Sequence, residues 1–457
     1  MAEKTITIES TLSALVEQKK YAALRDILVT MNPADVAAVF EDMDDETALP
    51  RLFRLLPKEL AADAFVEMEP ENQELLIRGF SDTELKEVVD ELYVDDAADL
   101  VEEMPANVVK RILRQADPEM RRLINEILQY PEDSAGSIMT TEFVYLRPHM
   151  TVEEAEKRIR RTGVDKETIN TCYVTDKGKL IGAISIRTLL LSEHDDIVQD
   201  IMEPNVISVT TSTDQEDVAQ MFSKYNFNAM PVVDNEGRLV GIVTVDDAID
   251  VMEEETTEDI QIMAGMSPTE KPYLHTSVFE TWKARIPWLL ILMLSATLTG
   301  LVINRFESQL AACIVLSSFI PMLSGTGGNS GTQASVAVIR ALALNEVEFA
   351  DLPSVVWKEV RVSVLCGVCL AAANFVKMLL VDYLWLQNGV TPAVAMVVCL
   401  TLVGVVFIAK VVGCVLPILA DKLGFDPAVM ASPFITTIVD VLSLLVYFSI
   451  ATGLLGL

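Results

Sequence analysis

The chain has 457 residues, of which 67 are acidic and 35 are basic, so its formal net charge is −32 at pH 7. Residues 281–457 contain nine acidic and nine basic residues among long apolar runs, so the whole excess of negative charge lies in residues 1–280. Since about 20 apolar residues suffice to cross a bilayer, this composition excludes a single water-soluble globule. The charge of the first part also excludes nucleic acid and anionic lipid as its binding partners and favours cations.

The first 132 residues have the pattern of short helices throughout. The string AAD at 61–63 recurs at 97–99, with a methionine five residues after each aspartate. This irregular repeat predicts an acidic all-α domain, residues 1–132, whose helices stack as a short superhelix. Asp95 and Asp99 share one helix face, where they repel each other unless a cation lies between them, the alternative being a solvated face. Residues 1–10 lack a signal peptide, so we expect this domain in the cytoplasm.

Residues 138–263 contain an internal repeat. The string KGKLIGAI at 177–184 recurs as EGRLVGIV at 236–243, and each copy reads as a polar turn, a β-branched strand and a helix. The pattern resembles the CBS domain, whose two copies normally pack as one α/β module that senses ligands. We expect the copies at 133–200 and 201–254.

The second copy carries Thr244 and Asp247 at the positions of the CBS family's nucleotide signature. In the first copy Arg187 and Thr188 stand where the matching aspartate is expected. The resemblance implies a site for ATP or another adenine nucleotide at Thr244 and Asp247. Asp247 can equally belong to a metal cluster.

Eight carboxylates lie in the segment 246–259, which contains no Lys or Arg. Spacings of three and four place four of them on one stripe of a helix, namely Asp247, Asp250, Glu254 and Glu258. Repulsion at this density destabilises a compact state, and a divalent ion that bridges carboxylates reverses the effect. We therefore predict a connecting helix, residues 255–280, that responds to charge and leads to the first membrane span.

The last part of the chain, 281–457, is expected to be an α-helical membrane domain with five spans. Lys and Arg cluster at one side of these spans, which predicts a cytoplasmic N-terminus and an external C-terminus. The spans are expected at Pro287–Asn304, Ser308–Ile339, Val362–Leu380, Ala393–Ala420 and Pro427–Leu457.

The second span contains PMLSGTGGNSGTQ at 321–333. Four glycines and a proline should loosen this helix, and irregular backbone is tolerated at bilayer depth where it is buried in protein or lines a wet cavity. Gly325, Gly328, Asn329 and Gln333 are the candidates for such a lining. The alternative is close helix packing by small residues.

The fifth span contains one carboxylate, Asp440, about 20 Å along the helix from Pro427 at 1.5 Å per residue. Inserting this carboxylate into the bilayer costs about 2.5–3.5 kcal/mol, so we expect Asp440 to have a specific role there. A carboxylate beside the Thr436 hydroxyl is an oxygen lining suited to a hydrated Mg²⁺. The alternative is an ion pair with Lys377 or Lys410. The sequence shows no Ser/His/Asp set, Walker loop or metal-enzyme His pair, so catalysis is not expected.

This order of domains, together with the motif at 321–333 and Asp440, resembles the MgtE family of magnesium channels across nearly the whole chain. The resemblance implies a homodimer in the plasma membrane, with a pore lined by the second and fifth spans and Asp440 facing the ion. It also implies that cytosolic Mg²⁺ closes the pore by binding sensor carboxylates, here Asp95, Asp99, Glu216, Asp247, Asp250, Glu255, Glu258 and Asp259. Asn226 is neutral where the family's sensor can use an acid. A divalent-cation carrier or exchanger and a membrane-tethered CBS ligand sensor are the alternatives.

Overall fold

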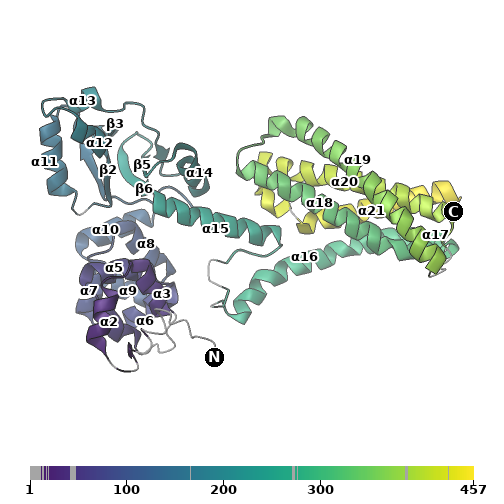
Figure 1. Ribbon diagram of the computed structural model, residues 1–457, viewed down its shortest axis with the longest axis horizontal. Helices are drawn as coiled ribbons and strands as arrows, with labels where there is room; N and C mark the ends of the chain where they lie inside the picture. Colours follow the sequence, from purple (N-terminus) through teal and green to yellow (C-terminus); the bar gives the residue numbers. More distant parts are fainter. Residues whose placement is uncertain are drawn as a thin grey trace, which may run out of the picture. The chain divides into compact units, whose positions relative to one another are not determined.

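The computed structural model describes residues 12, 15, 16, 18, 20–41, 48–164, 166–269, 273, 274, 276–385, 390–430 and 432–456. The segment 1–10, on which the prediction of a missing signal peptide rests, lies outside the described residues. The chain divides into two compact units, Met1–Met252 and Glu253–Leu457. We call them the acidic unit and the membrane unit (Figure 1).

The acidic unit begins with the predicted helical domain. Its helices start at residues suited to that position: Ser81 forms a capping box with Glu84 before α7, and the Asp117 side chain accepts from two backbone N–H groups of α10. Helices α3, α5, α7 and α9 pack in succession around one apolar core, as a stacked superhelix requires. The helices are α2 (Tyr21–Leu28), α3 (Pro33–Glu41), α4 (Leu49–Phe53), α5 (Lys58–Val66), α6 (Pro70–Gly79), α7 (Asp82–Val89), α8 (Val94–Glu103), α9 (Ala106–Gln115) and α10 (Pro118–Ile127).

Two small sheets with the same topology follow, which confirms the predicted repeat. In each sheet the first strand is parallel and the third antiparallel to the central one. The first copy comprises β1 (Phe143–Leu146), α11 (Val152–Thr162), β2 (Thr168–Asp176), β3 (Lys179–Ser185), α12 (Ile186–Leu191) and α13 (Val198–Ile201). The second comprises β4 (Val209–Thr210), α14 (Gln215–Tyr225), β5 (Ala229–Val233), β6 (Leu239–Thr244) and the start of α15 (Val245–Met263). Tyr173, Ala229 and Ile242 form an apolar cluster between the copies.

Helix α15 carries the acidic segment and is continuous across residue 254, so the predicted domain boundary falls inside it. The predicted connecting helix, 255–280, ends early, at Met263. Beyond it the Gln261 side chain accepts a hydrogen bond from the Thr269 N–H (2.9 Å) and holds the following loop. Gly265, in this turn, has a φ of +72°, a conformation that favours glycine.

The membrane unit contains α16 (Val278–Arg305), α17 (Glu307–Ala312), η1 (Ile314–Phe319), α18 (Ile320–Ala343), η2 (Phe349–Asp351), α19 (Leu352–Lys377), the π-helical η3 (Met378–Trp385), α20 (Pro392–Lys422), η4 (Pro427–Met430) and α21 (Ser432–Leu455). Four helical segments of the described chain are long and apolar enough to cross a membrane: Val278–Arg305, Phe349–Tyr383, Pro392–Lys422 and Pro427–Leu455. The predicted second span is not among them; it comprises α17, η1 and α18, and its glycine and hydroxyl residues lower the hydropathy of α18.

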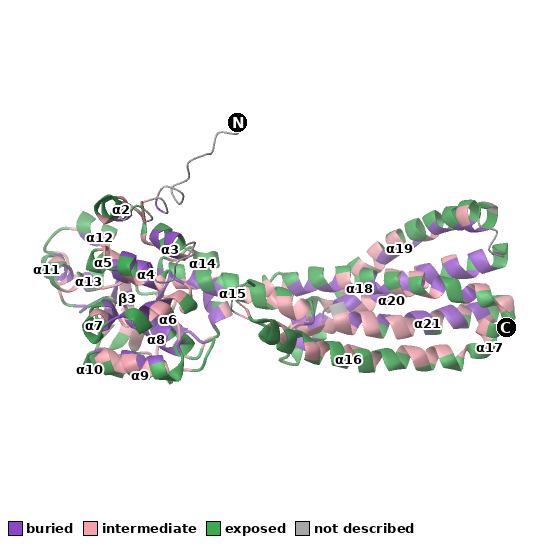
Figure 2. Cartoon of the chain, turned by 90° about the horizontal axis from the view of Figure 1, so that it is seen from below, coloured by how far each residue is buried: buried purple, intermediate pink, exposed green. Residues whose placement is uncertain are grey.

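Helices α18, α20 and α21 pack against one another, whereas α16 has no buried residue along its length (Figure 2). Helix α16 contacts α21 through half-buried residues, and its exposed apolar side chains lie where lipid would cover them.

The prediction of a loosened second span is wrong, because α18 is a regular α-helix through all four glycines. Pro321 lies in its first turn, where a missing N–H costs nothing. The glycines instead allow close packing. A Cβ on Gly327 would lie 2.7 Å from Val405 of α20, and one on Gly331 would lie 2.6 Å from Ile435 of α21. The alternative of small-residue packing is correct for these two positions.

Replacing Gly413 of α20 by alanine should destabilise the membrane unit. A Cβ there would overlap the Gly331 carbonyl oxygen, which as backbone cannot move aside. We expect a loss of about 1–3 kcal/mol, typical of overpacking, seen as a lower melting temperature of the detergent-solubilised protein. Gly404→Ala on the same helix is the control, since its Cβ would meet Val446 at an ordinary 3.4 Å. Equal melting temperatures of the two variants would contradict this account.

Candidate functional site

One face of α18 presents an exposed polar stripe. Gly325, Asn329 and Gln333 are exposed and follow one another at intervals of four residues, about one helical turn. Gly328 is not part of this stripe: it is buried, and a Cβ on it would lie 3.0 Å from Thr436 of α21. The polar residues predicted to line a pore therefore share one face, with Gly328 packed beside it.

Asp440 lies on α21, half-buried, and accepts a hydrogen bond from the Ser324 side chain of α18. The helix begins at Ser432, so the aspartate is about 12 Å along it, nearer than the 20 Å expected from Pro427. Residues 427–430 instead form the separate turn η4. Ser324 precedes the exposed Gly325, so Asp440 lies close to the polar stripe of α18.

The alternative ion pairs for Asp440 are wrong. The Lys377 ammonium lies 2.8 Å from a carboxylate oxygen of Asp382, and the Lys410 ammonium lies 3.5 Å from Glu359. Each lysine therefore has an acidic partner other than Asp440. A structural salt bridge to these lysines does not explain why a carboxylate is kept at this depth.

Hydroxyl groups lie one turn before Asp440. The side chains of Thr436 and Thr437 each donate a hydrogen bond to the Pro433 carbonyl oxygen, both at 3.0 Å. Because the hydroxyl protons are used in this way, the oxygen lone pairs remain as acceptors. Together with Asp440, this surface offers oxygen atoms alone, which are the ligands of hard divalent cations.

In the acidic unit, carboxylates of the helical domain meet those of the CBS copies. Asp95 is only 6% exposed, and one of its carboxylate oxygens, Oδ1, has no hydrogen-bond partner. Burial, followed by the charge of Asp247, raises its pKa well above the usual value. The α8 N-terminus is held to the first CBS copy, because the Val94 N–H donates to the Glu142 carboxylate (3.2 Å). Asp99, one turn on, is exposed.

Two further carboxylates of this cluster were missed by the sequence analysis. Burial, followed by the charge of Asp247, raises the pKa of Asp96 to about 7. Burial, followed by the charge of Asp96, raises that of Glu167 to about 8. Glu142 and Glu167 directly precede the paired parallel strands β1 and β2, a position from which their proximity could have been inferred.

Asp247 and Thr244 bind each other. The Thr244 hydroxyl donates to the Asp247 carboxylate at 2.5 Å, and the Thr244 N–H donates to the same oxygen at 3.2 Å. Burial raises the pKa of Asp247 to about 6, although these hydrogen bonds oppose the shift. In the described part of the chain, no three His, Cys, Asp or Glu side chains are already arranged to hold a metal ion. The carboxylates of α8, Glu167 and Asp247 therefore lie near one another, but their oxygen atoms are not arranged as the ligands of a bound metal ion.

The raised pKa values predict that the metal-free acidic unit becomes more stable as the pH falls. An unfolded carboxyl group titrates near pH 4, whereas Asp96, Asp247 and Glu167 titrate between about 6 and 8 when folded. The folded state therefore binds more protons in this window, and protonation stabilises it. In EDTA, the melting temperature of the wild type should rise by several degrees when the pH is lowered from 8.5 to 6.0. The same change in pH should raise the melting temperature of Glu167→Gln by a smaller amount. A flat profile in EDTA would contradict this prediction.

The remaining sensor candidates lie on two helices. Glu216 is half-buried in the first turn of α14 and accepts from the Gln220 side chain (3.1 Å). On α15, Asp250 and Glu258 are exposed, whereas Glu255 and Asp259 are half-buried.

Asp259 connects α15 with the helices of the membrane unit. Burial, followed by the charges of Asp426 and Glu255, raises its pKa to about 6, while Arg340 acts in the opposite direction. Asp426 directly precedes η4, and Arg340 lies in the last turn of α18. The turn after α15 also contacts α21, since a Cβ on Gly265 would lie 2.9 Å from Pro433. The end of the acidic helix therefore lies beside the same two helices that carry the polar stripe and Asp440.

Family models match three parts of the chain. They are the MgtE divalent cation transporter model at residues 320–450, the MgtE intracellular N domain at 31–133, and the CBS domain at 135–195 and 198–254. Among solved structures, the cytosolic domain of the Mg²⁺ channel MgtE in complex with ATP is 38% identical, with a TM-score of 0.51, over 53% of this chain and 100% of that one. The soluble part of a magnesium transporter is 32% identical, with a TM-score of 0.51, over 54% and 97%.

Two curated relatives match over almost their whole length. The magnesium transporter MgtE of Thermus thermophilus is 39% identical over 450 residues, which cover 97% of this chain and 98% of the relative. The magnesium transporter MgtE of Bacillus subtilis is 33% identical over 440 residues, covering 96% and 95%. The predicted resemblance is confirmed, and the chain belongs to the MgtE family of divalent cation transporters.

Proposed function

We propose that this protein is a Mg²⁺-selective import channel of the plasma membrane and has no catalytic activity. The observation that carries the proposal is Asp440, a carboxylate within an apolar helix, beside hydroxyl groups and with Lys377 and Lys410 engaged elsewhere. A carboxylate at bilayer depth is costly unless a cation or water compensates its charge. Magnesium keeps several of its waters, so one carboxylate from each of two subunits, with hydroxyl oxygens nearby, suits the hydrated ion.

The pore requires a second copy of the chain. Asp440 and the exposed residues Asn329 and Gln333 supply oxygen atoms from one side only. In a homodimer related by a two-fold axis, the same faces of α18 and α21 from both subunits enclose a polar path. In this proposal α18 crosses the membrane as the second of five spans, together with the four apolar helical segments, the N-terminus is cytoplasmic and the C-terminus is external.

The proposal includes closure of the pore by cytosolic Mg²⁺. In the acidic unit, carboxylates of α8 lie near Asp247, and the shifts in their pKa values arise from burial and from other carboxylates. Divalent ions among them would stabilise this compact arrangement by mass action. In the membrane unit, Asp259 lies near Asp426, so an ion between these two would hold α15 against the start of α21. High magnesium therefore favours a closed state.

The sensor residues are Asp95, Asp99, Glu216, Asp247, Asp250, Glu255, Glu258 and Asp259, and we add Asp96 and Glu167. The CBS pair is proposed to bind ATP or another adenine nucleotide, in line with the ATP complex of the 38% identical relative. The positions named for it are Thr244 and Asp247. In this structure these two side chains bind each other, so nucleotide binding there would have to replace that hydrogen bond.

Uptake into liposomes tests the transport proposal. The purified protein should carry Mg²⁺ into the vesicles, with Ca²⁺, Mn²⁺ and Co²⁺ transported more slowly at equal concentration. Single-channel recording in a planar bilayer separates a channel from a carrier or exchanger. A channel gives discrete current steps, whereas a carrier or exchanger moves too few ions per second to give a measurable current from one molecule. Vesicles that take up no divalent ion would leave the membrane-tethered ligand sensor as the better account.

A further inference from the structure

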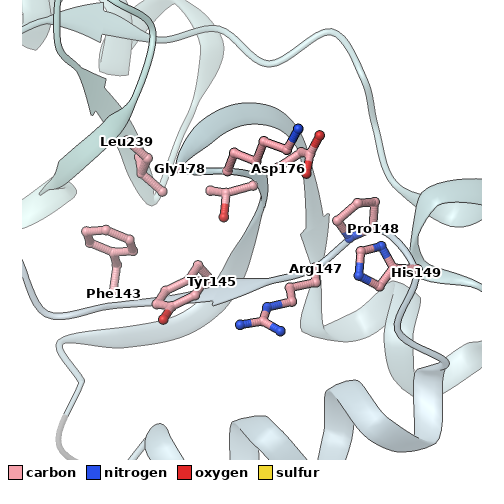
Figure 3. A pocket seen from close by; sticks show the side chains of 10 residues that line it. Phe143, Tyr145, Arg147, Pro148, His149, Asp176, Gly178 and Leu239 are labelled. Atoms are coloured by element: carbon pink, nitrogen blue, oxygen red, sulfur yellow. The ribbon is translucent and has the colours of Figure 1, made fainter.

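A pocket of about 530 Å³ lies where the two CBS copies join (Figure 3). Phe143 and Leu239 lie at one end of it, Arg147 and His149 at the other, and Tyr145 between them. The remaining lining residues are Pro148, Thr175, Asp176, Lys177 and Gly178. The first CBS copy contributes two segments to this lining: β1 with the residues that follow it, and the end of β2 with the turn that leads to β3. The second copy contributes Leu239, the first residue of β6.

Backbone contacts between the two copies fix the shape of this pocket. The Leu239 N–H donates to the Gly178 carbonyl oxygen (3.0 Å), and the Leu180 N–H donates to Gly237 (3.1 Å). The hairpin residues Lys177 and Gly178 both have positive φ, at 52° and 86°. The tight turn and the hydrogen bonds across the two copies therefore hold the pocket in a preformed shape, which lowers the cost of binding a ligand.

The aromatic side chains are also held in place. The Arg158 guanidinium lies 4.4 Å from the centre of the Tyr145 ring, and its Nε donates to the Tyr145 carbonyl oxygen (2.9 Å). The Phe143 ring packs edge-on against Tyr173, with the ring centres 6.3 Å apart. Nevertheless, 43% of Tyr145 is exposed. Two fixed rings with Leu239 beside them form an apolar surface on which a flat ring can stack.

The charged lining stands out in a chain with a net charge of −32. Arg147, Lys177 and His149 line the pocket with only one carboxylate, Asp176. Basic side chains in the lining suit phosphate groups, which accept charge-assisted hydrogen bonds. A carboxylate can accept hydrogen bonds from sugar hydroxyls, as acidic residues do in other nucleotide sites.

We propose that this pocket binds a nucleoside phosphate, with the base against Phe143, Tyr145 and Leu239 and the phosphates at Arg147 and Lys177. The site is separate from the one predicted at Thr244 and Asp247. Thr244 is the last residue of β6, whereas Leu239 is its first, so the two sites lie at opposite ends of this strand. The inference rests on the proposed nucleotide regulation and does not depend on the proposed transport of Mg²⁺.

Equilibrium binding to the full-length protein in detergent, in buffer without Mg²⁺, tests the proposal with three probes: ATP, AMP and inorganic triphosphate. Arg147→Glu should weaken ATP binding at least about tenfold, because it turns an attractive charge into a repulsive one. Tyr145→Ala should weaken it about tenfold through lost stacking, whereas Tyr145→Phe, which keeps the ring, should bind as the wild type does. Arg160→Glu, on the exposed face of α11, is the charge control and should have no effect.

Triphosphate should bind at least about tenfold more weakly than ATP, because it lacks the base that stacks. Triphosphate binding equal to that of ATP would overturn the assignment of a nucleoside. All these comparisons are made in a Thr244→Val background, so that the site predicted at Thr244 and Asp247 does not contribute. Unchanged ATP binding on adding Arg147→Glu or Tyr145→Ala to that background would overturn the site itself, and so would complete loss of ATP binding in Thr244→Val with the pocket intact. A wild type that binds none of the probes would also refute the inference. Uptake of Mg²⁺ into nucleotide-free liposomes tests the transport proposal separately.

Discussion

Replacing Asp440 by alanine should reduce Mg²⁺ flux by an order of magnitude or more and remove the preference for Mg²⁺ over Ca²⁺. In the proposed pore, Asp440 supplies the charge that compensates for the partial loss of water around the ion, and the proposed homodimer would lose two such charges at once. The variant should still fold, since burying alanine avoids the cost of about 2.5–3.5 kcal/mol of a carboxylate in the bilayer. Flux and selectivity are measured in liposomes.

Two further variants make this test specific. Asp421→Asn removes an exposed carboxylate from the last turn of α20 and should leave the flux unchanged. Ser324→Ala removes the hydrogen bond to Asp440 and should lower the flux less than Asp440→Ala, because the charge remains. Wild-type flux and selectivity in Asp440→Ala would end the assignment of this residue to the ion path.

Under the proposed gating mechanism, neutralising the acidic helix should keep the channel open at Mg²⁺ concentrations that would close the wild type. The variant combines Asp247→Asn, Asp250→Asn, Glu255→Gln, Glu258→Gln and Asp259→Asn. Two effects oppose each other in it. Lost bridging by divalent ions favours the open state, whereas relieved repulsion between carboxylates favours the closed state.

We expect lost bridging to dominate. A divalent ion between carboxylates orders several groups at once, whereas repulsion between exposed groups is screened beyond about 8–10 Å in physiological salt. The half-buried Asp259 is the strongest single contributor, since Asp426 and Glu255 are its acidic neighbours and burial limits screening. Single-channel recordings with stepwise increases of Mg²⁺ on the cytoplasmic side measure this response.

The control is a variant with five neutralised carboxylates at exposed positions away from the cluster. These are Asp26, Glu126, Glu132, Asp195 and Asp200. Its closure by Mg²⁺ should match that of the wild type if position rather than total charge decides gating. As a second readout, Mg²⁺ should protect α8 and α15 from protease in the wild type, and EDTA should expose both. Unchanged closure in the acidic-helix variant, with digestion indifferent to Mg²⁺, would refute the mechanism.

The sequence by itself determined the features that depend on neighbouring residues along the chain. Apolar runs longer than a bilayer is thick predicted the membrane spans, and the repeated strings at 177–184 and 236–243 predicted two CBS copies. Asp440 was recognisable because it is the one carboxylate in its apolar segment. These properties follow from local composition and spacing, so no knowledge of packing was needed.

Only the tertiary structure decided which distant groups meet. It gave Lys377 and Lys410 partners other than Asp440, and it placed Glu167 beside the carboxylates of α8. It also showed α18 to be a regular helix, although its glycines predicted a break. The reason is physical: an isolated glycine weakens a helix, but Gly327 and Gly331 lie where any side chain would overlap α20 or α21, so close packing outweighs the local preference.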